Sequence, residues 1–231
     1  MSVTAVVVVD DHDGGPHPLT LLAGTPLVTH AVRCLLDSSL VDRVVVLDHL
    51  GRADEVLAAC SGLPVSVRAA GAGAGFGTHA DQRHAPRPGD ASITDGPAEV
   101  LLLHDAARPL APAALAVAVV DAVRSGCAAA IPVLPMPDTV KRVDAAGLVQ
   151  SSVDRATLRV LQTPHAVRRD LFSGPPLRAA LGLAAAGWPV RTVPGDALAF
   201  AVHSAWDLTL AELLLAERVG RAGKGPGRMG S

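Results

Sequence analysis

Residues 100–109 read Val-Leu-Leu-Leu-His-Asp-Ala-Ala-Arg-Pro. The four apolar residues at the start of this segment predict a buried strand, because strands covered on both faces are continuous apolar runs. Asp105 and Arg108 follow directly, so a carboxylate and a guanidinium lie where that strand ends. Ligands bind at this carboxyl edge in open α/β sheets. A carboxylate can hold a hard cation and a guanidinium can bind a phosphate, so we expect a ligand site here.

Short Val-rich runs alternate with longer segments of helical spacing along the rest of the chain. The expected strands are residues 3–9, 41–47, 65–67, 100–103, 128–133, 158–163 and 190–193. The expected helices are residues 27–36, 53–60, 112–125, 177–186 and 205–218. This alternation predicts an α/β fold with a mostly parallel, doubly wound sheet.

One segment interrupts the alternation with a predicted hairpin. Residues 139–142 and 148–151 have the composition of short strands, and they flank the turn sequence Asp144-Ala145-Ala146-Gly147. We expect this hairpin to form an arm over residues 137–156. The arm belongs to one expected domain over residues 1–219.

Two further segments lack an apolar period. Residues 71–96 are rich in Gly, Ala, His and Pro, so we expect a long mobile loop in which His79 and His84 are solvated. The Gly-rich and basic residues 220–231 are expected to form a disordered tail.

The composition restricts the class of protein. The chain has 231 residues with a formal net charge of −2, which gives no indication of nucleic-acid binding. Cys34, Cys60 and Cys127 have no metal-site spacing and are odd in number, which is typical of small core residues in a reduced protein. No signal peptide and no membrane-length apolar run are expected. We therefore expect a cytoplasmic protein with neither a nucleic-acid nor a membrane partner.

Four segments in order make the chain recognisable: residues 103–109, residues 137–142, residues 153–155 with 161–164, and residues 199–212. In these the chain resembles the 2-C-methyl-D-erythritol 4-phosphate cytidylyltransferases of the non-mevalonate isoprenoid pathway. The resemblance extends from Val3 to about Val219 and is strongest over residues 100–171. It implies a nucleotidyltransferase-like, Rossmann-related sheet with a protruding β-hairpin arm.

The resemblance also implies an activity and its residues. Such enzymes join the nucleoside monophosphate of CTP to the phosphate of a sugar alcohol and release pyrophosphate. Asp105 would hold Mg²⁺ and the nucleotide, with Arg108 as its catalytic neighbour. Arg108, Thr139 and Arg155 would bind methylerythritol phosphate, and Lys141 would lie beside them. The arm crosses to a partner subunit in this family, so a homodimer is implied.

The segment after the first strand departs from the family pattern. The family has a Gly-rich loop that contains an Arg, followed by a Pro-Lys pair, and these groups bind the triphosphate. Here residues 10–18 read Asp-Asp-His-Asp-Gly-Gly-Pro-His-Pro, so the Arg is absent and His17 stands at the position of the Lys. The acidic residues Asp10 to Asp13 favour a polar loop over a metal site.

Other family features are also replaced. A Gly-Gly-x-x-Arg segment is missing near residues 70–85, and Ala201 stands in place of a second Lys. Asp196 is the nearest acid to a missing acidic segment, and His165 is expected to be an ordinary loop residue. Two interpretations remain open: a divergent cytidylyltransferase with impaired catalysis, and an inactive pseudoenzyme that serves as a dimeric binding or regulatory partner. An altered donor or acceptor is a third possibility.

Overall fold

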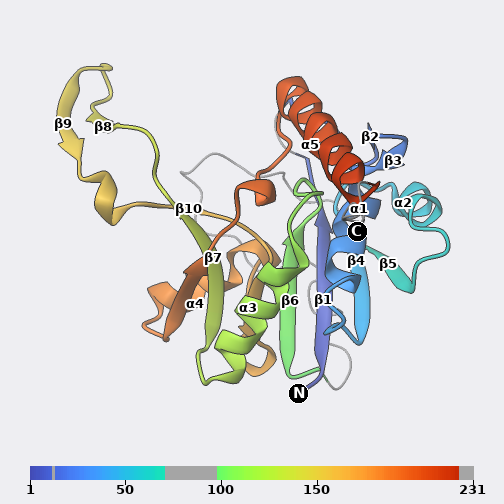
Figure 1. The fold of residues 1–231 in the computed structure, drawn as a ribbon. Helices are drawn as coiled ribbons and strands as arrows, with labels where there is room; N and C mark the ends of the chain where they lie inside the picture. The colour runs from blue at the N-terminus through green and yellow to red at the C-terminus, as the bar shows by residue number, and fades with distance from the viewer. Residues whose placement is uncertain (12–13, 71–97, 224–231) are drawn as a thin grey trace, which may run out of the picture.

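The computed structural model describes residues 1–11, 14–70 and 98–223, with side chains as far as residue 218. An eight-stranded sheet forms its centre (Figure 1). Its strands are β1 (Val3–Val9), β4 (Arg43–Asp48), β5 (Val65–Ala69), β6 (Val100–Asp105), β7 (Ala129–Pro135), β10 (Arg159–Leu161), β11 (His165–Arg168) and β12 (Val190–Pro194). The continuous apolar runs expected to be strands therefore lie in this sheet.

The order of the strands follows from their pairing. β6 and β4 flank β1 in parallel, and β5 lies beyond β4. β11 pairs antiparallel with both β6 and β7, so β6 and β7 run in the same direction. β12 pairs in parallel with β7 at the same residues as β11, which places it on the other edge of β7. The mostly parallel sheet predicted from the sequence is confirmed, with β10 and β11 as its antiparallel members.

Both faces of the sheet are covered, because successive residues of a strand point to opposite faces. Val3, Ala5 and Val7 of β1 belong to a core cluster that includes residues of α1 (Leu27–Leu36), α2 (Ala53–Ala59) and α3 (Ala113–Arg124). The alternate residues of β1, Val6 and Val8, belong to a second cluster with α4 (Ala179–Ala185). This two-sided burial explains why the central strands contain few polar residues.

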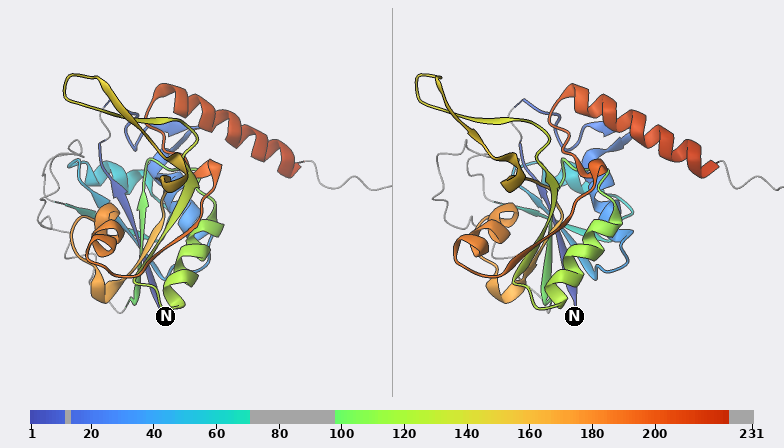
Figure 2. Two further views of the ribbon diagram at one scale, coloured as in Figure 1. Left: turned by 90° about the vertical axis from the view of Figure 1, so that its left-hand side faces the viewer. Right: turned by 60° about the vertical axis from the view of Figure 1, so that its left-hand side comes forward.

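A β-hairpin arm and the last helix project from the same end of the molecule (Figure 2). The arm consists of β8 (Val140–Val143) and β9 (Val149–Val153), and its turn is closed by the Asp144 carboxylate, which accepts from the backbone N–H groups of Ala146 and Leu148. The predicted hairpin is thus present. The helix is α5 (Ala205–Gly223), and the described helices include none with the length and apolar character of a membrane span.

The structure corrects several sequence-based expectations. His165 is not a loop residue but begins β11, inside the main sheet. A short hairpin of β2 (Leu21–Leu22) and β3 (Thr25–Pro26) was not expected, and α5 continues five residues past the expected end at Arg218. The tail expected to be disordered over residues 220–231 is instead helical at 220–223. Its remainder and the predicted loop at 71–96, with His79 and His84, lie outside the described residues.

Candidate functional site

Three acidic residues lie at neighbouring strand ends on the carboxyl edge of the sheet. Asp105 is the last residue of β6 and is paired with Val8 of β1, while Asp48 is the last residue of β4 and is paired with Val9. Asp10 follows β1 directly and is buried. The edge predicted from residues 100–109 is therefore where the structure places Asp105. In Figure 1 this edge faces the end from which the arm projects.

A tight turn brings Asp105 and Arg108 together after β6. The Asp105 carboxylate accepts a hydrogen bond of 2.9 Å from the Ala107 backbone N–H, and the Arg108 N–H donates 3.0 Å to the Asp105 carbonyl. The small residues between them allow the turn to lie against the core, where Ala106 and Ala107 are buried. The spacing of the two charged residues thus comes from local hydrogen bonding.

Two buried residues that contact each other, Thr163 and His104, support this turn. The Thr163 hydroxyl accepts from the Asp105 backbone N–H at 3.1 Å and lies 2.9 Å from Nδ1 of His104. The Thr163 hydroxyl can therefore donate its own proton to Nδ1 of His104. The proton of a neutral His104 ring then lies on Nε2, which is 3.2 Å from the Arg108 carbonyl oxygen. Burial lowers the pKa of His104 to about 4, consistent with this neutral form. The sequence did not reveal this role for Thr163.

Arg108 connects three segments of the chain. Its guanidinium donates to the Ala199 carbonyl and, at 3.3 Å, to the Leu161 carbonyl. Burial lowers the pKa of Arg108, and the nearby Asp105 carboxylate opposes that shift. Nε of Arg108 is buried without a hydrogen-bond partner among the described residues. Backbone carbonyls of two distant segments, at Leu161 and at Ala199, therefore hold the guanidinium beside the turn that follows β6.

Gln162 forms a second connection between the same segments. Its amide donates to the Asp196 carbonyl at 2.7 Å and accepts from the Asp196 backbone N–H at 2.9 Å. The Asp196 carboxylate accepts from the Leu198 N–H at 2.8 Å, so this acid caps the turn that leads to Ala199. Gly195 leaves the space for this approach, since a Cβ there would lie 2.3 Å from Oε1 of Gln162.

His165 is the least satisfied polar side chain of the site. It is 3% exposed, and neither ring nitrogen has a hydrogen-bond partner among the described residues. Burial, and then the charge of Arg108, lower the pKa of His165 to about 4, although the nearby Gln162 backbone opposes this. A buried polar group without a partner is unusual and requires an explanation from function or from ordered water. Nothing in the sequence beyond its place after Pro164 distinguished this histidine.

The predicted substrate-binding residues Thr139, Lys141 and Arg155 lie on or beside the arm. All three are exposed. Lys141 donates to the Ser152 hydroxyl across the arm at 2.5 Å, and Arg155 donates to the Pro137 carbonyl at 2.8 Å, which joins the two ends of the arm. The five predicted site residues therefore form two groups, one at the sheet edge and one on the arm.

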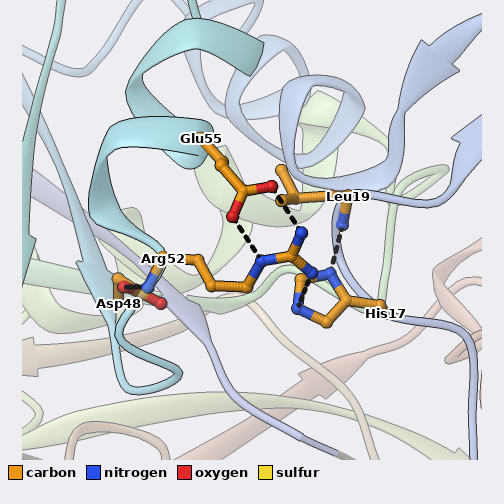
Figure 3. Close-up of polar contacts among 5 residues, drawn as sticks. All are labelled: His17, Leu19, Asp48, Arg52 and Glu55. Carbon is orange, nitrogen blue, oxygen red and sulfur yellow. Dashed lines mark hydrogen bonds and ion pairs between the residues drawn. The ribbon is translucent and has the colours of Figure 1, made fainter.

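A cluster of His17, Arg52 and Glu55 lies near the segment after β1 (Figure 3). His17 accepts a 3.0 Å hydrogen bond at Nδ1 from the Leu19 N–H. The Arg52 guanidinium binds Glu55 through Nε at 2.7 Å and through Nη2, and its Nη1 lies 3.3 Å from Nε2 of His17. Arg52 was not among the residues predicted from the sequence. Residues 12–13 of the preceding segment, and the region where the family has Gly-Gly-x-x-Arg, lie outside the described residues apart from Ala70.

Comparison with known proteins identifies the family. The model of the family described as "IspD: 2-C-methyl-D-erythritol 4-phosphate cytidylyltransferase" matches residues 12–217. Enzymes of that name from Nocardia farcinica and Frankia casuarinae are 41% and 40% identical over 211 residues, which cover 88% of this chain and 87% and 75% of theirs. The crystal structure of the Thermus thermophilus enzyme is 25% identical with a TM-score of 0.67, covering 94% of this chain and all of that one. The chain therefore belongs to the 2-C-methyl-D-erythritol 4-phosphate cytidylyltransferase family.

Proposed function

We propose that this chain transfers a cytidylyl group from CTP to the phosphate of 2-C-methyl-D-erythritol 4-phosphate. An oxygen of the acceptor phosphate bonds to the α-phosphorus, the bond from that phosphorus to the β-phosphate oxygen breaks, and pyrophosphate leaves. The observation that supports this most is the turn from Asp105 to Arg108. It lies at the ligand-binding edge of the sheet and is fixed by hydrogen bonds to Thr163, Leu161 and Ala199 from distant segments.

Phosphoryl transfer of this kind needs positive charge around the reacting phosphates. Asp105 offers oxygen ligands to Mg²⁺, but the described residues include no group of three or more His, Cys, Asp or Glu side chains that could hold a metal ion. This fits Mg²⁺, which is commonly held by one or two carboxylates together with substrate phosphates. Asp105 would hold the ion in that manner. The bound ion would supply positive charge at the triphosphate.

The arm residues are proposed to act across a homodimer. Val143, Leu148 and Val149 are exposed apolar residues of the arm. An isolated two-stranded hairpin has little stability of its own in water, so packing against a partner would stabilise the arm. In such a dimer Thr139, Lys141 and Arg155 of one subunit would bind the acceptor phosphate near Asp105 and Arg108 of the other.

One set of observations favours the second candidate, an inactive binding or regulatory partner. Asp10 and Asp11 stand where the family has a loop that binds the triphosphate, and like charges repel at short range. Burial, and then the charge of Arg52, lower the pKa of His17, so this residue does not supply the charge of the Lys that it replaces. Weak binding of CTP would follow from these features alone.

Pyrophosphate release from purified protein with CTP, Mg²⁺ and methylerythritol phosphate separates the two candidates. Asp105→Asn keeps an oxygen that can accept from the Ala107 N–H but removes the charge, so we expect at least a hundredfold loss of turnover. Asp121→Asn on α3 is the control, because that exposed carboxylate contacts Arg124 in a surface ion pair. Absence of wild-type turnover, with no CTP binding at millimolar concentration, would favour the inactive partner.

A further inference from the structure

Arg52 brings a positive charge to the same sheet edge as Asp105, from a different strand. β4 ends at Asp48, beside the last residue of β1, and the His49 N–H donates to the Val9 carbonyl at 3.0 Å. The turn after β4 carries Arg52, whose guanidinium reaches the segment after β1 at His17 (Figure 3). Strands lie about 4.8 Å apart, so the ends of β4 and β6, with β1 between them, are about 10 Å apart.

The position of Arg52 is fixed at its backbone and at its side chain. The fully buried Asp48 carboxylate accepts from the N–H groups of Leu50, at 3.0 Å, and Arg52, at 2.6 Å. Glu55 holds the guanidinium through Nε and Nη2, and this hydrogen bonding raises the pKa of Arg52. The third nitrogen, Nη1, is directed towards His17. Arg52 is therefore a charged group with a defined orientation.

The contact between Arg52 and His17 joins two hydrogen-bond donors. Because the Leu19 N–H donates to Nδ1 of His17, the proton of the neutral ring lies on Nε2. That nitrogen is 3.3 Å from Nη1 of Arg52, which is also a donor. Neither group can accept from the other. An anionic oxygen placed beside both would accept from each of them, as phosphate oxygens commonly do.

A surface ion pair alone explains these features less well. Exposed pairs contribute only about 0–1 kcal/mol to stability, and such a pair has no need of a second donor beside it. Arg168 can be compared with Arg52, because its side chain is also 42% exposed and it also binds a nearby carboxylate, that of Asp170. Arg168 is paired with Val100, at the start of β6, so it lies at the opposite edge of the sheet. The two pairs differ in their position and in the presence of His17.

We propose that Arg52 and Nε2–H of His17 bind the pyrophosphate portion of the nucleotide triphosphate. This inference rests on the proposed function, which places the reacting α-phosphorus near Asp105 and extends the rest of the triphosphate across the end of β1. Arg52 thereby supplies a guanidinium N–H donor, from the turn after β4, beside the segment after β1, while Glu55 holds the other side of the guanidinium. It is a substrate-binding residue, and its contribution is to the affinity for the donor.

Steady-state kinetics of Arg52→Ala against Arg168→Ala test this proposal. Loss of a charge-assisted contact commonly weakens binding by about tenfold or more. We expect Arg52→Ala to raise the KM for CTP and the inhibition constant of pyrophosphate by about tenfold. The KM for methylerythritol phosphate and the inhibition constant of CMP, which lacks the outer phosphates, should not change. Arg168→Ala should leave all four constants at their wild-type values.

Equal values for Arg52→Ala and wild type, or an equal rise for pyrophosphate and CMP, would overturn the proposal. Thermal unfolding of both variants shows whether either substitution affects folding. If the wild-type protein has no turnover, the proposed function fails, but calorimetry with magnesium pyrophosphate still measures the contact. Binding that is about tenfold weaker in Arg52→Ala than in Arg168→Ala would then support the site, and equal binding, or none to the wild type, would exclude it.

Discussion

Gly195 shows how a residue without a side chain can organise a site. It lies between β12 and the turn that presents the Ala199 carbonyl to Arg108. Its N–H donates to the Val133 carbonyl at 2.9 Å, while the Gln162 amide passes close to its Cα and binds the next residue, Asp196. The need for Gly here arises from close approach, because its φ is not in the left-handed region.

The substitution Gly195→Ala is expected to destabilise the protein. The new Cβ would lie 2.3 Å from Oε1 of Gln162 and 2.9 Å from the Val133 carbonyl oxygen, so the Gln162 amide must move or the backbone must shift. Overpacking of this kind typically costs about 1–3 kcal/mol. Urea unfolding measures the change, and loss of the Gln162 contacts should also lower the turnover.

Gly182→Ala is the matched control for that substitution. Gly182 lies within α4, where a Cβ would meet no neighbouring heavy atom within 4 Å, and its φ is not positive. Because Ala loses less conformational entropy than Gly in a helix, this variant should gain about 0.5–1 kcal/mol. A loss of stability in both variants, or in neither, would contradict the steric explanation for Gly195.

The residues of the site could be predicted from the sequence only where they directly follow a recognisable strand. Asp105 and Arg108 follow an apolar strand directly, and the edge position of Asp105 follows from that pattern. The supporting contacts join residues far apart in the chain: Thr163 with His104 across 59 positions, and Arg108 with Ala199 across 91. No periodicity in one sequence indicates such pairs. Arg52 could not be predicted for the same reason, since its neighbour His17 is 35 positions away.

At the level of elements, long and strongly patterned segments were predicted well and short ones were not. β1 and α1 have the expected bounds because their apolar residues repeat over seven and ten residues. β11 has only four residues, two of them His165 and Arg168, and it follows a proline. Its place between β6 and β7 depends on tertiary pairing. The two-residue strands β2 and β3 are likewise too short to produce a pattern.

The arm is the element on which the proposed dimer depends. Leu148 and Val149 are 64% and 65% exposed, and burial of such side chains against a partner is favourable. The double substitution Leu148→Ser and Val149→Ser should therefore shift the protein from dimer to monomer in sedimentation velocity. Leu181→Ser on α4, also an exposed leucine, is the control and should leave the dimer intact. A wild-type protein that sediments as a monomer would exclude the proposed dimer.

At the scale of the whole molecule, two buried histidines lie in neighbouring central strands of the sheet. His104 belongs to β6 and His165 to β11, and the two strands are neighbours in the middle of the sheet. Both rings are neutral, because burial lowers the pKa of each to about 4. The folded protein therefore keeps two uncharged imidazoles at its centre, and the unfolded chain exposes them to protonation.

This difference predicts that mild acid destabilises the fold. Between the unfolded pKa of about 6.5 and the folded value of about 4, the unfolded chain binds more protons, so the free energy of unfolding falls as the pH falls through that range. From pH 7.5 to pH 5, each histidine should remove about 2 kcal/mol. Urea unfolding at the two pH values measures the loss. The glutamine of His165→Gln cannot be protonated, so the free energy of unfolding of this variant should fall by about 2 kcal/mol less than that of wild type over the same range. An equal fall in both proteins would show that His165 is protonated in the folded state or buried in the unfolded one.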